Sequence, residues 1–398
     1  MKELLNRMVK GDAYIWLVIV VLAVASLLSV YSATGFLAYQ RQGGNTSHYM
    51  FWQMLSLGLG VAIMIVVSNI SSRYIARFSV LFLYLSVLLL AITLFSGVNL
   101  NTATRWLTIP GIGITFQPSE IAKLAIIVYV ARVLAQNQQE GVAADAAFKP
   151  IVFHVAIVAL LIFSENLSTA FLVVMVSAVM MFIGRVSLKL LFGSGVVVAI
   201  FLGLTLTLAS HVDFLPRAQT WANRVEVFLS SEEQSTAASY QSDQSKIAIA
   251  TGGILGKGPG NSVQRNFIPH PYSDFIYAII AEEYGFGGAF LILFCYLILL
   301  GRVSVIVRKS DRTFPAFLAY GLGLMLVSQA FLNMGVAIGV FPVTGQPLPL
   351  VSLGTTSVLF TCVAFGMILG AGRATLKEEV SEDVESSGNE EYYESEEK

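Results

Sequence analysis

Long runs of apolar residues, separated by short polar segments, dominate this chain. Ten of them have about the length that a helix needs to cross some 30 Å of hydrocarbon. They cover residues 13–34, 50–68, 78–97, 118–135, 150–164, 167–184, 189–210, 275–300, 313–334 and 351–372. The pattern predicts an all-α, polytopic membrane protein with ten transmembrane helices. A large extracytoplasmic loop, about 211–273, is expected between helices seven and eight.

The short polar segments refine this prediction. Only Ser164, Glu165 and Asn166 separate the fifth and sixth runs, so we expect a tight helical hairpin there. Residues 246–250 are short and amphipathic, which favours a position at the membrane interface. The polar stretch 230–245 just before them is expected to be a mobile part of the large loop.

Composition agrees with a membrane protein and suggests its boundaries. The chain of 398 residues is 56% hydrophobic and 12% charged, with a mean hydropathy of +0.73. We expect a cytoplasmic N-terminal segment (1–12), a transmembrane domain (13–374) and an acidic, disordered cytoplasmic tail (375–398). Residues 378–398 hold ten of the 25 acidic residues and a single base, Lys398, so the body is basic although the net charge is −1; a basic body favours contact with anionic membrane lipids.

Basic residues indicate the orientation of the predicted helices. With a cytoplasmic N-terminus, the short inside segments hold Lys2, Arg7, Lys10, Arg73, Arg77, Arg132, Lys149, Arg185, Lys189, Arg302, Arg308, Lys309, Arg312, Arg373 and Lys377. The short outside loops hold only Arg41 and Arg105. By the positive-inside rule, both termini are cytoplasmic, and residues 97–117, 211–273 and 335–350 face the exterior.

Several classes of function leave signatures that this sequence lacks. It has no Walker loop, dinucleotide-binding fingerprint or nucleic-acid-binding module, so neither ATP hydrolysis nor a nucleic-acid partner is expected. No inverted repeat of the kind found in many transporters is evident. The histidines do not have zinc-ligand spacing. Cys295 and Cys362 lie in apolar runs, which predicts buried thiols without a disulfide.

Asp274 stands where a polar, glycine-rich loop becomes the apolar run 275–300. Glu282 and Glu283 lie about 12 Å further along the same predicted helix. Ionisable groups at such depth are costly and normally face a bundle interior or a hydrated cavity. Asp274 could be a reacting carboxylate, or it could only favour the helix N-terminus while the glutamates pair with basic side chains.

A second polar group on the predicted outer side begins with Arg105 and Trp106. Pro118 suits the first turn of a helix, and this placement puts Glu120 and Lys123 one turn apart on one face. The pair could be an internal ion pair that anchors the helix. Alternatively, Lys123 and Arg105 could bind phosphate, with Glu120 holding the lysine in place.

Two further groups are expected on the same side. Lys257 lies in the glycine-rich run 252–260, whose backbone N–H groups could form a concave site for an anion or only a flexible turn. In 333–349, glycines and prolines break the helical pattern before Ser352 enters the last apolar run. Backbone groups freed near the membrane surface need a cavity or a protein partner, although a structural re-entrant turn would serve equally.

Together and in this order, these residues resemble the SEDS family of bacterial cell-wall polymerases, whose members include FtsW, RodA and SpoVE. The resemblance covers about residues 13–374. Its most specific marks are Arg105-Trp106, Gln117 to Glu120 with Lys123, Gln244 to Ile249 with Gly252-Gly253, Ser273 to Ile276 with Glu282, Glu283 and Gly285, and Thr344 through Pro349 to Gly354.

The resemblance implies a peptidoglycan glycosyltransferase that polymerises lipid II, the undecaprenyl-diphosphate-linked disaccharide peptide. It also implies a class B penicillin-binding protein transpeptidase and other divisome membrane proteins as partners. The family's essential aspartate falls on Asp274, the expected catalytic base. Contacts to the diphosphate or lipid II are expected from Arg105, Trp106, Glu120, Lys123, Lys257, Gln244, Lys246 and Ser352, with Glu282 and Glu283 as supporting buried acids.

The cofactor and the cellular role are less constrained. A divalent cation, Mg²⁺ or Mn²⁺, could share in stabilising the diphosphate, but no carboxylate cluster dictates a metal site. Residues 260–264 are more similar to division-type than to elongation-type members, which predicts septal synthesis in the bacterial cytoplasmic (inner) membrane. An elongation-type (RodA-like) polymerase, a lipid II flippase and a scaffold that only recruits the transpeptidase are the alternatives.

The chain also departs from the family pattern at two places. Asn166 stands where the family often has an aspartate, so either Glu165 supplies the charge or the position is neutral. His270 to Ser273 lacks the acid that usually precedes the aspartate, and we assign His270 to packing or helix entry.

Overall fold

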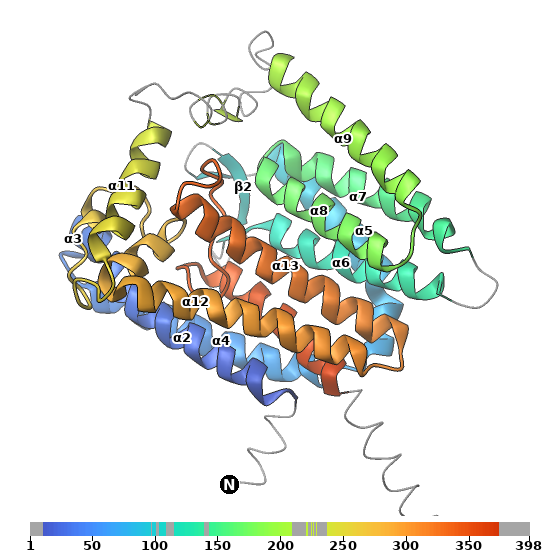
Figure 1. The fold of residues 1–398 in the computed structure, drawn as a ribbon, viewed down its shortest axis with the longest axis horizontal. Helices are drawn as coiled ribbons and strands as arrows, with labels where there is room; N and C mark the ends of the chain where they lie inside the picture. Colours follow the sequence, from blue (N-terminus) through green and yellow to red (C-terminus); the bar gives the residue numbers. More distant parts are fainter. Residues whose placement is uncertain are drawn as a thin grey trace, which may run out of the picture.

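The computed structural model describes residues 11–96, 98–100, 103–108, 115–138, 143–208 and 237–373, together with positions 220, 221, 224, 226 and 228 (Figure 1). Its longer helices are α2 (Ala13–Ala33), α4 (Thr46–Ser68), α5 (Ser72–Ser96), α6 (Pro118–Gln136), α7 (Phe148–Phe163), α8 (Leu167–Ile183), α9 (Leu188–Leu208), α12 (Ile276–Arg308), α13 (Thr313–Ala337) and a last helix over Thr355–Arg373. Shorter helices are α3 (Gly35–Gln42), η1 (Ala144–Ala147), α11 (Ala237–Gly252) and η2 (Gln264–Asn266). Every predicted apolar run coincides with one of the longer helices.

The helices confirm an all-α, polytopic membrane fold. In the described part of the chain, eight helices are long and apolar enough to cross a membrane. Two others differ: α8 has only 17 residues, and α6 carries Glu120, Lys123 and Arg132. The count of ten transmembrane helices therefore stays a prediction.

The predicted hairpin between the fifth and sixth runs is present. The helices α7 and α8 pack along each other and are separated only by residues 164–166. Asn166 caps α8, because its Oδ1 accepts hydrogen bonds from the N–H groups of Ser168 (3.1 Å) and Thr169 (3.2 Å). A neutral amide thus has a local structural task at the position where the family often has an aspartate.

The helix α12 is longer than the sequence pattern predicted. It continues eight residues past 300 to Arg308. Near that end, Arg302 pairs with Asp12, the residue that caps the N-terminus of α2. This ion pair connects the end of α12 to the beginning of α2, so both ends lie on the same side of the bundle.

Two predictions about segment boundaries were wrong. The last helix begins at Thr355 and not at 351, because Leu350 has a positive φ of 65° and residues 349–353 form turns. In the stretch expected to be mobile, residues 237–245 form the first part of α11. Residues 1–10 and the acidic tail from 374 onward lie outside the described residues.

The predicted outer loop 97–117 contains a small antiparallel sheet. Its strands β1 (Val98–Leu100), β2 (Ala103–Thr108) and β3 (Thr115–Phe116) are hydrogen-bonded in the order β1-β2-β3. The strand β2 contacts α5 and the beginning of α6. The sheet therefore holds Trp106 beside the helix that carries Glu120 and Lys123.

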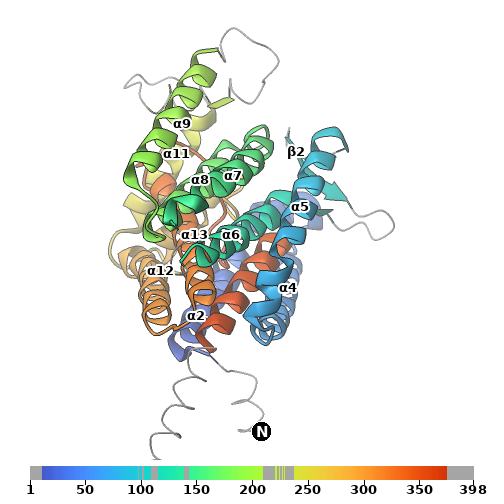
Figure 2. The same ribbon diagram turned by 90° about the vertical axis from the view of Figure 1, so that its right-hand side faces the viewer.

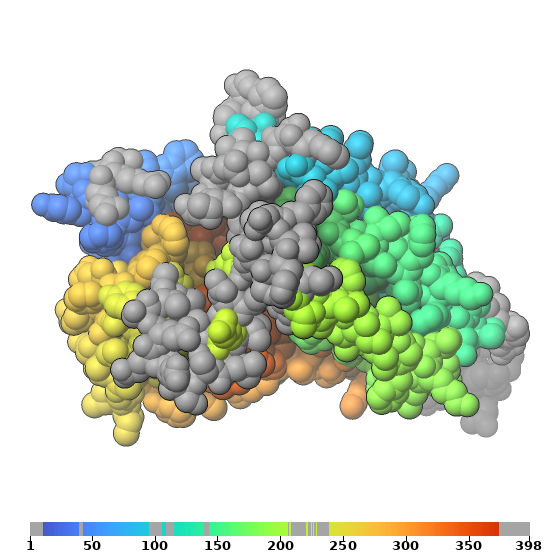
Figure 3. Space-filling view, turned by 90° about the horizontal axis from the view of Figure 1, so that it is seen from above, coloured from blue at the N-terminus to red at the C-terminus, as the bar shows by residue number. Residues whose placement is uncertain are grey.

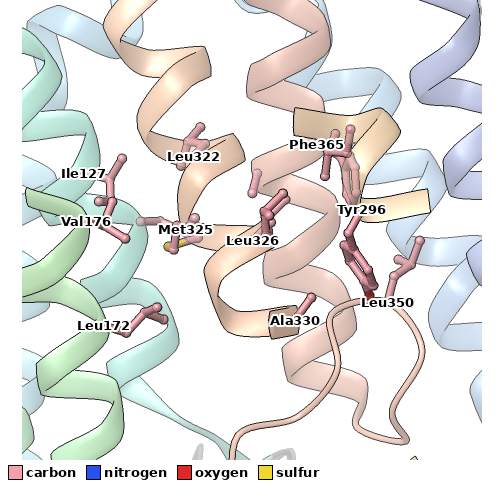
Figure 4. Packing of buried hydrophobic residues seen from close by; sticks show 14 of the residues in the cluster. Ile127, Leu172, Val176, Tyr296, Leu322, Met325, Leu326, Ala330, Leu350 and Phe365 are labelled. Atoms are coloured by element: carbon pink, nitrogen blue, oxygen red, sulfur yellow. The ribbon is translucent and has the colours of Figure 1, made fainter. Parts of the chain in front are cut away.

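The helix α13 lies in the centre of the bundle and packs against α12, α6 and α8. Figure 4 shows its side chains between two groups of neighbours. The residues in this part of the core are Leu322, Met325, Leu326 and Ala330 of α13, Ile127 of α6, Leu172 and Val176 of α8, Tyr296 of α12, and Phe365 of the last helix. The Tyr296 hydroxyl donates to the Pro349 carbonyl oxygen (2.6 Å), which connects this core to the turns before the last helix. Cys295 and Cys362 are buried free thiols, as predicted.

The helix α9 lies at the periphery. None of the residues in its most apolar stretch, Leu188–Thr205, is buried; α9 packs on α8, and its Phe201 ring lies against Phe163 of α7 (5.5 Å between ring centroids). Figure 2 shows it standing beside the bundle, and the view from above places α9 and α11 toward opposite ends of the molecule (Figure 3). Such an apolar, unburied helix is suited to contact with lipid.

Candidate active site

Asp274 lies directly before α12, at the end of the bundle where α3 and α11 also gather (Figure 1). A turn precedes it: His270 has a positive φ of 53°, and its carbonyl oxygen accepts from the Ser273 N–H (3.1 Å). Phe275 and Ile276, the next two residues, are fully buried, whereas Asp274 is half-buried. The carboxylate therefore stands at the boundary between the loop and the bundle interior, as the sequence indicated.

Neutral groups contact the Asp274 carboxylate. The Ser273 hydroxyl donates to Oδ1 (2.8 Å). On the other side, a Cβ added to Gly345 would lie 3.5 Å from Oδ2, so the backbone of Gly345 packs against the carboxylate. Gly345 has a φ of 66°, which glycine adopts without steric cost.

The backbone around Asp274 is fastened to the segment 346–353, here called the re-entrant segment. The Asn333 side-chain amide donates both to the Asp274 carbonyl oxygen and to that of Gln346 (2.8 Å each). The Ser352 hydroxyl donates to the Ser273 carbonyl oxygen (2.6 Å), and the Leu353 N–H donates to the Tyr272 carbonyl oxygen (2.9 Å). These bonds hold the carboxylate against its surroundings on two sides.

Lys123 joins the same network from α6. Its ammonium group is buried and forms the predicted ion pair with Glu120 (2.8 Å). It also donates to the Gln329 side-chain oxygen (3.1 Å), and the Gln329 amide donates to the Pro347 carbonyl oxygen (3.0 Å). A buried ion pair needs such additional hydrogen bonds to offset its desolvation. The pair thus positions the re-entrant segment through Gln329.

The helix α8 completes the network. The Gln346 side-chain amide donates to the hydroxyl of Thr169 (2.8 Å), the third residue of the helix that Asn166 caps. Glu165 is buried next to that cap. Residues from α6, α8, α13, the re-entrant segment and the turn before α12 therefore form one hydrogen-bonded network that includes the backbone of Asp274, although they are far apart in the sequence.

Glu282 and Glu283 belong to a second polar cluster further along α12. Glu282 is fully buried and pairs with the Lys257 ammonium group (2.5 Å). It also accepts from the Ser262 hydroxyl (2.5 Å) and from the N–H groups of Val263 (3.1 Å) and Gln264 (3.2 Å). This carboxylate therefore holds the loop 257–264 on α12, and the structure assigns Lys257 to that pair.

Glu283 connects the cluster to the first helix. The Ser32 hydroxyl of α2 donates to Glu283, and the Arg265 guanidinium donates to the same hydroxyl (2.9 Å) and to the Ser32 carbonyl oxygen (3.2 Å). The Ser262 N–H also donates to Glu283 (3.3 Å). Both glutamates thus bind neighbouring side chains, which agrees with the alternative in which they have a structural role.

The glycine-rich run is packed into a kink of α12. Gly285 interrupts that helix with a φ of 67° and a ψ of −163°. The N–H groups of Lys257 and Gly258 donate to the carbonyl oxygens of Glu282 and Glu283 (2.9 Å each), so they are not directed at an anion. A Cβ at Gly256 would lie 2.2 Å from the Glu283 carbonyl oxygen, which shows how closely the two backbones approach.

The remaining predicted site residues are divided between the sheet and α11. Trp106 is half-buried on β2, and the Arg105 side chain lies outside the described part of the structure. Gln244 is half-buried on α11. Lys246 pairs with the exposed Asp243 (3.4 Å), and its aliphatic chain covers Gly339 just after α13.

The sequence analysis predicted no site role for Gln329, Thr169, Asn333 or Gln346, although the last two lie in the stretch 333–349 that it singled out. Gln329 had a usable signal, because an amide inside an otherwise apolar helix needs a partner. Arg224, in the large outer loop, was also missed; it donates to the Val343 carbonyl oxygen (2.9 Å) and stacks over the Trp221 ring (5.4 Å).

The arrangement holds one carboxylate, a potential proton acceptor, at a fixed position at the end of the helical bundle. Among the described residues, Ser273 and Gly345 contact the Asp274 carboxylate, and Lys123 is connected to the network through Gln329. Among the described residues, no group of three His, Cys, Asp or Glu side chains could hold a metal ion. The divalent cation considered above stays a prediction.

Comparison with known proteins identifies relatives over nearly the whole chain. A model of the cell cycle protein family FtsW/RodA/SpoVE matches residues 12–376. The chain is 30% identical over 367 residues to a probable peptidoglycan glycosyltransferase FtsW from Trichlorobacter lovleyi, covering 91% of this chain and 93% of that protein. It is 32% identical over 367 residues to the peptidoglycan glycosyltransferase MrdB of Escherichia coli K12, covering 90% and 92%.

Solved structures share the fold. A chain from a peptidoglycan synthase complex that coordinates polymerization and crosslinking superposes with a TM-score of 0.71 at 24% identity, covering 92% of this chain and 98% of that chain. The rod shape determining protein RodA of Thermus thermophilus superposes with a TM-score of 0.64 at 21% identity and the same coverage. Because the family model spans nearly the whole transmembrane domain, the chain belongs to the FtsW/RodA/SpoVE family of cell cycle proteins.

Proposed function

We propose that this protein is a peptidoglycan glycosyltransferase that polymerises lipid II and that Asp274 is its general base. The observation that carries the proposal is the placement of Asp274, a half-buried carboxylate held between two segments at the end of a helical bundle. Membership of the family and the names of the relatives at 30–32% identity support the reaction class.

In the proposed reaction, a hydroxyl of one lipid-linked sugar attacks the anomeric carbon of another. The new glycosidic bond forms as the bond to the lipid diphosphate breaks, and the hydroxyl proton passes to the Asp274 carboxylate. A positioned base of this kind contributes roughly 10²–10⁴ in rate. Because Asp274 is fixed through its own carbonyl oxygen by Asn333, it does not have to be ordered when the substrate binds.

The departing diphosphate gains negative charge that nearby cations would stabilise. We assign this task to Arg105 and Arg224 on the outer loops, the latter because it contacts Val343, two residues from Gly345. Lys123 is buried and bound to Glu120 and Gln329, so its proposed contribution is to hold the re-entrant segment in place. A divalent cation would supply the same stabilisation.

We further propose that the protein acts in septal synthesis, in the bacterial cytoplasmic membrane with both termini inside. The similarity of residues 260–264 to division-type members supports this role, although relatives of both types are about equally similar. A class B penicillin-binding protein is the proposed partner, supported by the likeness of this fold to a chain of a peptidoglycan synthase complex.

The experiment is polymerisation of labelled lipid II by the purified protein in detergent. Asp274→Asn is nearly isosteric and should lower the rate about 10²–10⁴-fold. Asp145→Asn, which changes an exposed acid of η1 that accepts from the Ser187 N–H, is the matched control and should retain activity. Wild-type activity of Asp274→Asn would remove the base assignment. If the wild-type protein makes no polymer, with or without its transpeptidase, but moves lipid II across the membrane of vesicles, the flippase assignment would replace the glycosyltransferase assignment.

A further inference from the structure

A cavity of about 850 Å³ lies at the end of the bundle opposite Asp274. Asp274 precedes the first residue of α12, whereas the turn after Arg308 lines the cavity, so the length of α12 separates them. The α4–α5 turn and the end of the last helix, at Gly370 and Arg373, form the rest of the wall. In Figure 1 the α12–α13 turn is on the far side of the bundle from α3 and α11.

Arginine side chains dominate the charge of this cavity. Arg73, Arg312 and Arg373 line it, with Asp311 as the acid among its lining residues. A second cavity of about 320 Å³ shares Arg73, Ala76 and Phe314 with the first and adds Arg77 and Arg132. The two together are here called the basic trough, lined by five arginines and one aspartate.

The arginines are partly held in place. Arg373 donates to the Asn69 side chain, which also lines the trough. Arg132 donates to the Ala76 carbonyl oxygen (3.1 Å) and to the Ser79 hydroxyl (3.2 Å). Guanidinium groups with fixed stems lose less freedom when they bind an anion, and their planar donors match phosphate oxygens.

Backbone groups add to the positive field. The helices α5 and α13 both begin in the wall of the trough, at Ser72 and Thr313, and neither has an acidic residue in its first turn. The N–H groups of a first helical turn lack intrahelical acceptors, and the helix dipole favours an anion there. These two helix ends add to the positive charge that the arginines provide, and they would not define an anion site without the arginines.

The trough also has an apolar side at the level where the helices end. Ile70, Phe314 and Pro315 line it together with the arginines and the hydroxyls of Ser71 and Ser72. A ligand that fits this wall has a phosphate for the basic part and an apolar portion beside it. We propose that the basic trough binds the phosphate of an anionic phospholipid headgroup, with the lipid's apolar part against Ile70 and Phe314.

The site is separate from the reaction proposed for Asp274, and its test does not depend on that reaction. Purified full-length protein in detergent is titrated with phosphatidylglycerol, and bound lipid is measured by native mass spectrometry. Arg73→Gln/Arg312→Gln should weaken binding about 30-fold, because each basic side chain near an anionic headgroup contributes about fivefold. The charge-matched control Lys149→Gln/Lys189→Gln changes exposed lysines outside the trough and should bind like the wild type.

A second variant guards against misfolding of the first. Ser72→Asp places an acid at the start of α5, where it favours the helix but opposes a phosphate, so the affinity should fall while the melting temperature is kept. Unchanged phosphatidylglycerol affinity in both variants would overturn the proposal, and so would equal affinity for zwitterionic phosphatidylcholine.

Two further arms distinguish other occupants. If inorganic phosphate alone binds as tightly and with the same dependence on Arg73 and Arg312, the assignment to a lipid is overturned in favour of a soluble phosphate. The other candidate is the acidic tail of this chain, which follows Arg373. If the tail occupies the trough, it competes with the lipid. In that case Glu378→Gln/Glu379→Gln/Glu382→Gln would bind phosphatidylglycerol and the wild type would not, and the lipid assignment would fail.

Discussion

Asn333 offers the sharpest test of how the candidate base is positioned. One side-chain nitrogen of this buried residue donates to two backbone oxygens, those of Asp274 and Gln346. Asn333→Leu keeps the volume but removes both bonds. Each net hydrogen bond contributes about 1 kcal/mol, and a buried carbonyl left without a donor costs about 1–3 kcal/mol, so we expect a loss of about 2–4 kcal/mol in stability.

The effect on catalysis should be larger than stability alone predicts. Without Asn333 the Asp274 backbone is held from one side only, and a displacement of about 1 Å at a reacting group can cost about 10² in rate. The assay is lipid II polymerisation at a temperature well below the melting transition of the variant. Asn261→Leu is the matched control, because its amide also donates to a backbone oxygen, that of Lys257, but at the exposed surface.

The expected result is a rate about 10²-fold lower for Asn333→Leu, with Asn261→Leu within about threefold of the wild type. A folded Asn333→Leu protein that polymerises lipid II at the wild-type rate would refute the view that the re-entrant segment positions Asp274. Loss of stability with full activity would limit Asn333 to a structural role.

Two further predictions concern the second polar cluster. Glu282→Gln leaves the Lys257 ammonium without its buried counter-charge and should destabilise the protein by about 3–5 kcal/mol, measured as a lower melting temperature in detergent. The double variant Glu282→Gln/Lys257→Met removes both charges and should recover part of the lost stability. No recovery would contradict the pairing. Gly256→Ala places a Cβ 2.2 Å from the Glu283 carbonyl oxygen and should prevent stable folding. Gly253 has a φ of 58° and open space around it, so Gly253→Ala should lower the stability by only about 1–2 kcal/mol. Equal melting temperatures of the two variants would contradict the close packing at Gly256.

The helices were predictable because a membrane restricts the possible structures. A spanning segment must satisfy its backbone internally, so an apolar run of sufficient length can form little but a helix. The predicted run 118–135 corresponds to α6 (Pro118–Gln136), and 167–184 corresponds to α8 (Leu167–Ile183). The ends were less predictable where hydrogen bonds between distant residues decide them, as at Leu353, whose N–H bonds the Tyr272 carbonyl oxygen before the last helix begins.

The candidate site was predictable in part. The family resemblance located Asp274, and helical spacing gave the Glu120–Lys123 ion pair, which the structure confirms. Spacing along one helix could not give the partner of Lys257, because Glu282 is 25 residues away and is reached only when the loop folds back on α12. The connection from Lys123 to the re-entrant segment could likewise not be predicted from the sequence, because it passes through Gln329 on another helix.

The separation of Lys123 from Asp274 by neutral groups has a chemical reason. A cation in direct contact with a carboxylate stabilises its charged form and so weakens it as a proton acceptor. A diphosphate leaving group nevertheless needs positive charge close by. In the reaction proposed above, Lys123 is bound to Glu120 and Gln329 while Ser273 and Gly345 contact the Asp274 carboxylate, so Lys123 belongs to the network without pairing with the proposed base. The positioning of Asp274 likewise relies on a neutral side chain: the Asn333 amide donates to the carbonyl oxygens of Asp274 and Gln346, and so connects the residue to the re-entrant segment without adding a charge.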